Sequence, residues 1–248
     1  MQCRAAPVLF CPFQRRPLAV KAAIASGMME PQMDQPFLVL TAEDLDQAAD
    51  ALADKGWVVL RDAFSPSLVG ALRSELKVLQ DKDLLEEGGV GRGDDHLQTK
   101  TIRRDLIHWV TGRSAAENAY LAQMEALRLS LNRRLFLGLF EFEANFAVYP
   151  PGGFYKRHMD SFKGAANRIV SAVTYLNEGW AASDGGDLRL FDGSGQHLAE
   201  VRPEGGTLVL FLSEEIPHEV AVTYRTRLSI AGWYRVNASV SDAVDPPA

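Results

Sequence analysis

Residues 227–236 read RLSIAGWYRV, a segment dominated by apolar, aromatic and β-branched residues. Four further segments of this kind occur in the second half of the chain: FEANFAVY, IVSAVTYL, DLRLF and TLVLFL. They are separated by the turn sequences PPGG, DGG, DGSG and PEGG. Short strands divided by such turns predict a β-sandwich or barrel, here of the jelly-roll type.

The first half of the chain has a helical pattern instead. We expect helices in TAEDLDQAADALADKG, in SPSLVGALRSELKVLQ and in a longer segment that ends near residue 135, with WVVLRDAF as a short strand between the first two. The expected end signals are Thr41 as N-cap and Gly56 as stop for the first helix, Ser65 and Pro66 at the start of the second, and a capping box of Ser114 and Glu117 for the third.

These patterns predict an α+β fold in one domain that covers residues 37–236. Helical support is expected over residues 37–140 and the jelly-roll core over residues 141–236. Residues 1–36 are expected to form a basic, disordered extension, and residues 237–248 a flexible tail.

Composition restricts the classes of protein that fit. Of the 248 residues, 47% are hydrophobic and 23% charged, which is typical of a globular domain. The net charge of −6 argues against nucleic acid as a partner, and no apolar run is long enough to span a bilayer. The two cysteines, Cys3 and Cys11, both precede the predicted domain, so the domain has no disulfide or thiolate metal site. We therefore expect a reducing compartment, the cytoplasm.

The first thirty residues leave an alternative open. They are basic, alanine-rich and poor in acids, which also suits a transit peptide and an organellar location. A disordered extension, or a start of translation at Met28 or Met29, explains the same composition.

The segment FYKRHMD, residues 154–160, places His158 and Asp160 two positions apart. At the end of a strand both would point to one face and could ligate one cation. His218 follows the strong strand TLVLFL and is the natural third ligand. Two imidazoles and one carboxylate leave three open positions, which is the arrangement of non-haem Fe(II) oxygenases.

Arg227 lies nine residues after His218, again in a predicted strand. An odd offset along one unbroken strand would point it the opposite way, so VTYRT must turn, bulge or begin a new strand. A buried guanidinium needs an anion, and a dicarboxylate cosubstrate would supply one.

These segments together resemble the 2-oxoglutarate- and Fe(II)-dependent dioxygenases of the prolyl 4-hydroxylase superfamily. The likeness is greatest to the hypoxia-inducible-factor prolyl hydroxylases and their bacterial relatives. It is carried by YPPGGFYKRHMD, NRIVSAVTYLN, GGDLRLF, PHEVAVTYRTR and the closing WYR, with IRRDLIHWVTG and GWVVLRDAF upstream. It covers roughly residues 37–236 and implies a double-stranded β-helix core.

The resemblance also implies roles for individual residues. His158, Asp160 and His218 would hold iron, and Arg227 would bind the distal carboxylate of 2-oxoglutarate. Two tyrosines, Tyr149 and Tyr175, would line the cosubstrate pocket. Three further residues would lie near the substrate: Arg168, Trp233 and Tyr155. The glycine-rich loop at residues 80–100 falls where this family has a mobile loop that grips substrate, and ascorbate would re-reduce the iron.

The expected reaction is hydroxylation of a substrate C–H bond, with release of succinate and CO2. The substrate is most simply a prolyl residue in a protein or peptide. The alternatives are a hydroxylase of a small molecule or free amino acid, and a metal-binding or sensing module without turnover.

Simpler interpretations exist for several of the residues. The three aromatic residues Tyr149, Tyr175 and Trp233 could be ordinary core, and Arg168 a surface charge. The other histidines are expected to be structural or solvent-facing, and Asp184, Asp187 and Asp192 to serve turns. The sequence does not predict the oligomeric state.

Overall fold

The computed structural model describes residues 40–89, 101–161 and 167–236, all within the unit Gln35–Ala248. A second unit, Met1–Asp34, lies outside the described residues. The expectations for the basic extension, for residues 90–100 of the glycine-rich loop and for the tail therefore stay predictions.

The helices of the described part are α1 (Ala42–Lys55), α2 (Pro66–Asp81) and α3 (Ala115–Leu135), with a short 3-10 turn η2 (Ala182–Asp184). The strands are β1 (Trp57–Leu60), β2 (Glu86–Glu87), β3 (Leu106–Trp109), β4 (Leu139–Tyr149), β5 (Tyr155–His158), β6 (Arg168–Tyr175), β7 (Leu188–Phe191), β8 (His197–Val201), β9 (Leu208–Leu212), β10 (His218–Val220) and β11 (Arg227–Val236).

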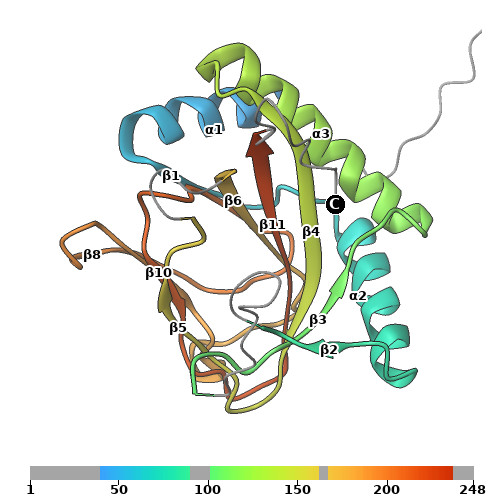
Figure 1. The fold of residues 1–248 in the computed structure, drawn as a ribbon. Helices are drawn as coiled ribbons and strands as arrows, with labels where there is room; N and C mark the ends of the chain where they lie inside the picture. Colours follow the sequence, from blue (N-terminus) through green and yellow to red (C-terminus); the bar gives the residue numbers. More distant parts are fainter. Residues whose placement is uncertain (1–39, 90–100, 162–166, 237–248) are drawn as a thin grey trace, which may run out of the picture. The chain divides into compact units, whose positions relative to one another are not determined.

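These strands form two antiparallel sheets. The larger sheet has the order β1-β9-β6-β11-β4-β3-β2, and the smaller sheet the order β5-β10-β7-β8. Figure 1 shows α1, α2 and α3 gathered on the side of the large sheet that faces away from β5 and β10. The predicted α+β fold, a jelly-roll core supported by N-terminal helices, is confirmed.

Alternation along β11 divides the interior into two cores. Ile230 and Tyr234 belong to the core between the large sheet and the helices. Residues of opposite parity, Arg227, Ser229 and Trp233, line a cavity on the other face of the sheet. A second apolar core, which includes Tyr149, Tyr175, Leu190 and Phe211, fills the remaining space between the two sheets. The helices thus cover one face of the large sheet, while the cavity lies on the other face.

The ends of α1 and α2 confirm the predicted signals. The Thr41 hydroxyl accepts a hydrogen bond from the Asp44 amide, and Gly56 closes the helix with a left-handed φ of 78°. The Ser65 hydroxyl accepts from the Leu68 amide, and Pro66 occupies the first helical position.

The predicted capping box of α3 is half wrong. The Ser114 hydroxyl does accept from the Glu117 amide, at 2.9 Å. The Glu117 carboxylate, however, accepts from the amides of three preceding residues, Thr111, Gly112 and Arg113, and not from Ser114. Glu117 therefore fixes the chain that enters the helix, because three amide donors compete better for one carboxylate than a single one.

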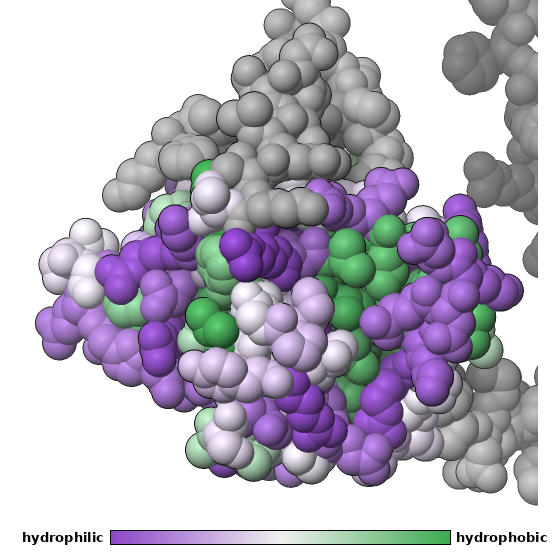
Figure 2. All heavy atoms as spheres, turned by 90° about the horizontal axis from the view of Figure 1, so that it is seen from below, coloured by the Kyte–Doolittle hydropathy of each residue, from purple (hydrophilic) through white to green (hydrophobic). Residues whose placement is uncertain are grey.

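The surface is mostly hydrophilic where Figure 2 shows it, with an apolar strip among the charged side chains. None of the helices described here has the length and apolar character needed to cross a membrane.

Candidate active site

His158, Asp160 and His218 come together at one end of the small sheet. His158 ends β5, His218 begins β10, and the two histidines are directly paired across these strands. Asp160 lies just beyond β5, with one carboxylate oxygen 3.5 Å from Nε2 of His158 and the other 3.5 Å from Nε2 of His218. One ligand atom of each residue lies within 4.8 Å of the others, so a single ion could reach all three.

Backbone carbonyls orient both imidazoles. Nδ1 of His158 lies 2.8 Å from the Lys156 carbonyl oxygen, and Nδ1 of His218 lies 3.2 Å from the Ile216 carbonyl oxygen. A carbonyl can only accept, so each Nδ1 carries the proton and each Nε2 has its lone pair free. This is the tautomer that a metal-ligating histidine requires.

The site also sets the protonation states that a metal needs. Burial, and then the charge of His158, lower the pKa of His218 to about 4, against the opposing effect of Asp160. Burial opposes ionisation of Asp160, but His218, His158 and the Ser171 hydroxyl outweigh it and hold the pKa of Asp160 below its ordinary range. A neutral imidazole and an ionised carboxylate are both ready to bind a cation near neutral pH.

Arg227 is deeply buried, with 1% of its surface exposed, at the start of β11. Its Nε donates to the Gly186 carbonyl oxygen at 2.8 Å, and its Nη1 donates to the Ser229 hydroxyl at 3.0 Å. Its Nη2 and the hydroxyl of Tyr175 are both buried without a hydrogen-bond partner. Two unsatisfied buried donors beside a cation fit one missing anion with several acceptor oxygens.

The path of the chain explains how Arg227 reaches this place. β10 ends at Val220 in the small sheet, and β11 begins at Arg227 in the large sheet. Of the three options predicted for VTYRT, the structure shows a turn: these residues belong to neither strand, and the new strand begins only at Arg227. Gly186 helps, because its φ is 72° and an added Cβ would lie 3.0 Å from the Arg227 Cδ.

Two tyrosines flank the guanidinium of Arg227. The rings of Tyr149 and Tyr175 have their centroids 5.0 and 5.1 Å from its central carbon. Burial raises the pKa of Tyr175 to about 12, and it also raises the pKa of Tyr149. Both phenols are therefore protonated and can donate hydrogen bonds.

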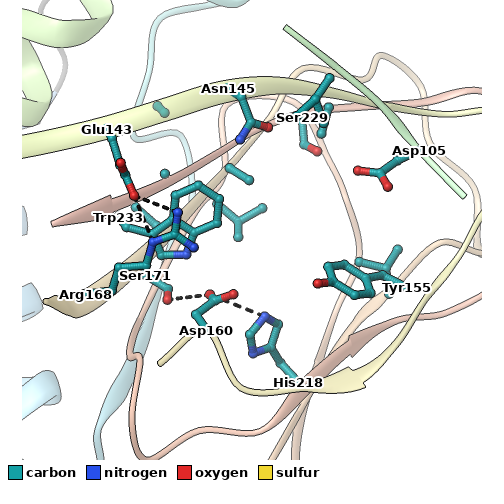
Figure 3. Close-up of a pocket in the computed structure, with 18 of the residues that line it drawn as sticks. Asp105, Glu143, Asn145, Tyr155, Asp160, Arg168, Ser171, His218, Ser229 and Trp233 are labelled. Carbon is teal, nitrogen blue, oxygen red and sulfur yellow. Dashed lines mark hydrogen bonds and ion pairs between the residues drawn. The ribbon is translucent and has the colours of Figure 1, made fainter. Parts of the chain in front are cut away.

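Arg168 and Trp233 line the same cavity, and Figure 3 shows them on the side opposite to Tyr155. The Arg168 guanidinium lies 3.7 Å above the Trp233 ring and is held there by Glu143, whose Oε1 accepts from Nε at 2.8 Å. Glu143 also pairs with the buried Arg235, at 3.1 Å. Arg168 is thus not an isolated surface charge, since it is part of a paired cluster.

Tyr155 lies closer to the metal ligands than to the far end of the cavity. Its ring stacks on the His158 imidazole with centroids 3.6 Å apart. On the other side, Arg103 lies 4.5 Å from the Tyr155 ring and forms an ion pair with the buried Asp105. Tyr155 therefore limits the movement of a ligand histidine, in addition to lining the cavity.

The cavity has a volume of about 1150 Å³ and joins all these groups. Its lining includes Arg227, the His–Asp–His cluster, and the group of Arg168, Trp233 and Arg235. Eight of the nine residues predicted from sequence line this cavity, and the ninth, Tyr175, packs beside Arg227. The roles assigned to them stay predictions.

Residues expected to have no role lie elsewhere. Nδ1 of His108 bonds the Leu84 carbonyl oxygen, and His197 packs edge-on against Phe191. Asp192 accepts from the Ser194 and Gln196 amides, as a turn residue does. His96 lies outside the described residues.

Several cavity residues were missed from sequence: Arg103, Asp105, Glu143, Asn145, Ser171, Ser229 and Arg235. Alternation would have found Ser229 and Arg235, which lie two and eight positions after Arg227 in one strand. The same rule relates Ser171 to Tyr175 in β6. Glu143 has no comparable signal, because its partners Arg168 and Arg235 lie far from it in the sequence.

Comparisons with known proteins agree with this geometry. A sequence profile described as 2OG-Fe(II) oxygenase superfamily matches residues 144–235. Mouse "Prolyl hydroxylase EGLN3" is 30% identical over 199 residues, covering 77% of this chain and 82% of its own length. The human "Egl nine homolog 1" is 29% identical over 201 residues, and there the chain spans 46% of the relative's length. For the Caenorhabditis elegans "Hypoxia-inducible factor prolyl hydroxylase" it spans 27%.

Solved structures give the same picture. A Pseudomonas putida prolyl-4-hydroxylase is 44% identical with a TM-score of 0.71, and the match covers 78% of this chain and all of that one. A prolyl hydroxylase from Trichoplax adhaerens, solved with a peptide of the hypoxia-inducible factor oxygen degradation domain, is 25% identical with a TM-score of 0.71. That match covers 77% of this chain and 88% of the other.

Proposed function

This chain belongs to the 2OG-Fe(II) oxygenase superfamily, among the prolyl hydroxylases, and we propose that it hydroxylates a prolyl residue in a peptide or protein. The reaction consumes one O2 and one 2-oxoglutarate and releases succinate and CO2. One oxygen atom of O2 enters the new hydroxyl group, and the other enters succinate.

One observation carries this proposal. Arg227 lines the same cavity as the His–Asp–His cluster and has an unsatisfied buried donor, as does the phenol of Tyr175, whose ring lies 5.1 Å from the guanidinium carbon. The cluster fits Fe(II), and the donors fit the distal carboxylate of 2-oxoglutarate. A metal-ligand cluster or a buried arginine alone is common in proteins. Together they provide what binding of both Fe(II) and 2-oxoglutarate requires.

The chain's own residues divide the work. His158, Asp160 and His218 would hold the metal and leave positions open for exogenous groups. Arg227 would orient the cosubstrate, while Tyr149 and Tyr175 cover the guanidinium and keep water from it. When bound, Fe(II) with 2-oxoglutarate supplies the oxidising power that breaks an unactivated C–H bond.

Charge pairing in the cavity favours a residue within a peptide over a free amino acid. A free amino acid carries an ammonium and a carboxylate, and each needs an opposite charge. Among the described cavity residues, Arg168 and Arg235 already pair with Glu143, and Arg103 pairs with Asp105. Apart from the groups reserved for iron and cosubstrate, no described charge is left for a zwitterion. A peptide-linked proline brings no charge of its own.

Three further parts of the proposal rest on the family resemblance and composition alone. Ascorbate is the proposed reductant after uncoupled turnover. The proposed location is the cytoplasm, with an organelle as the alternative. With a net charge of −6, nucleic acid is not proposed as a partner.

The test is a succinate-release assay with Fe(II), 2-oxoglutarate and a panel of proline-containing peptides, matched peptides with alanine for proline, and free amino acids. We expect release only with proline peptides, and mass spectrometry should find one added oxygen on proline. Release with free proline alone would move the function to small molecules. Metal binding without any release would identify a non-catalytic module.

A further inference from the structure

A pair of buried serines lies behind the Asp160 carboxylate. The Ser171 hydroxyl donates to Asp160 Oδ2 at 2.6 Å, as Figure 3 shows, and its oxygen lies 2.9 Å from the Ser213 hydroxyl oxygen. Ser171 has 1% of its surface exposed and Ser213 has none. Two hydroxyls rarely occur in such a place unless hydrogen bonds satisfy them.

The direction of these hydrogen bonds follows from chemistry. An ionised carboxylate can only accept, so the single Ser171 proton points to Asp160. The Ser213 hydroxyl must then donate to the Ser171 oxygen. The bonds form a chain from Ser213 through Ser171 to Asp160, in which each bond strengthens the next.

Asp160 needs such support because of its position. It lies after the end of β5, so no sheet ladder fixes its backbone as the ladder fixes His158 and His218. Ser171 belongs to β6, in the middle of the large sheet, where it is paired with Trp233 on one side and Phe211 on the other. The hydroxyl thus ties a loop residue to a rigid element of the opposite sheet.

We propose that Ser171, supported by Ser213, is the positioning residue that holds Oδ2 of Asp160 and presents Oδ1 to the iron. This inference rests on the proposed function. A carboxylate held by one oxygen binds a metal through the other, which preserves the open positions that cosubstrate and O2 need. Partners of a ligand commonly contribute 10- to 100-fold to metal affinity.

Equilibrium binding of Mn²⁺ to the metal-free full-length protein, without 2-oxoglutarate, tests the proposal independently of turnover. The electron paramagnetic resonance signal of free Mn²⁺ gives the dissociation constant. We expect Ser171→Ala to weaken binding by about 10- to 100-fold. Ser213→Ala should weaken it by about threefold, because it removes only the second bond of the chain.

Ser229→Ala is the matched control. Ser229 is equally buried in the same cavity, but its hydroxyl contacts Arg227 and not Asp160. Its Mn²⁺ affinity should stay within about twofold of wild type, since removing a hydrogen bond distant from the ligands does not change ligand geometry.

The outcomes separate the possibilities. Wild-type affinity in Ser171→Ala, or equal losses in Ser171→Ala and Ser229→Ala, would overturn the proposal. If Ser171→Ala does not fold, judged by its thermal unfolding, Ser213→Ala decides: a loss not shared by Ser229→Ala supports the chain, and no loss overturns it. A wild-type protein that binds no Mn²⁺ would instead contradict the proposed function.

Discussion

Arg227 and Arg235 begin and nearly end the same strand, on the same face and in the same cavity, yet their surroundings are opposite. Arg235 is 5% exposed and pairs with Glu141 at 2.9 Å and with Glu143 at 3.1 Å. Arg227 is more deeply buried and has no ion pair among the described residues, where a carbonyl and a hydroxyl are its partners.

Under the proposed function, this difference would separate a structural cation, Arg235, from one that binds a ligand, Arg227. A buried charge without an opposite charge is costly, and such a charge persists when a ligand supplies the missing partner. The arginine with two carboxylates is complete within the protein. Arg227 has no such partner among the described residues, as the proposed cosubstrate site requires.

The largest effect on activity is expected from substitution of the proposed metal ligands. Asp160→Ala or His218→Ala should abolish succinate release, because two protein ligands do not hold iron in the required geometry. The fold should survive, since Asp160 lies outside the strands and His218 is the first residue of the short strand β10. Circular dichroism and the succinate assay together check this. Near-wild-type release by either variant would remove that residue from the ligand set.

Arg235→Ala should act on stability and not on the cosubstrate. It leaves Glu141 without its described ion pair and removes one of the two partners of Glu143. Breaking a buried ion pair costs about 3 kcal/mol of unfolding free energy or more. Urea denaturation measures this loss, and the dependence of succinate release on 2-oxoglutarate should be unchanged. A large rise in the apparent KM for 2-oxoglutarate would show that Arg235, like Arg227, affects cosubstrate binding, and would contradict this prediction.

Arg227→Ala should do the reverse. Losing a charge-assisted pair of about 1.5–3 kcal/mol weakens 2-oxoglutarate binding roughly 10- to 150-fold. Arg227→Lys should recover part of this, because the charge remains while the fork is lost. The measurement is the 2-oxoglutarate dependence of succinate release.

Arg225 is the control for this prediction. Its side chain is 48% exposed and binds Asp184 and the carbonyl oxygens of Glu178 and Gly179. Arg225→Ala should leave the apparent 2-oxoglutarate affinity within about threefold. If it is the crippled variant, the anchor has been assigned to the wrong arginine.

The smallest effect concerns how the stability of the protein depends on pH. The pKa of His218 is about 4 in the folded metal-free protein and 6.5 as an ordinary histidine. Between these values the unfolded chain binds more protons than the folded protein. The contribution of His218 to the free energy of unfolding is therefore fully present above pH 6.5 and is lost as the pH is lowered. We expect a loss of roughly 2 kcal/mol between pH 6.5 and 5. Denaturation of the metal-free wild type and of His218→Gln measures it, and an equal slope in both would refute this cause.

Much of this arrangement was readable in the sequence, and the reasons for the rest are physical. The strands, most helix caps, and the candidates His158, Asp160, His218 and Arg227 follow from local patterns and spacing. The other five site residues came only from the family resemblance. The offset of Arg227 from His218 even predicted the break between β10 and β11. The hydrogen-bond partners of Glu117 were predicted wrongly, because they depend on the conformation of the loop that precedes α3. Glu143 was missed because its two arginine partners lie on strands far from it in the sequence, and no local rule pairs them.

The direct pairing of His158 with His218 across β5 and β10 has a consequence for how the protein matures. Residues so far apart in the chain meet only after these strands have paired, so the unfolded chain offers no preformed site. Metal captured by the folded form adds to its stability in proportion to the logarithm of metal concentration. Correct pairing of β5 with β10 and metal binding are therefore coupled, because a chain with these strands out of register would not bring the two histidines together.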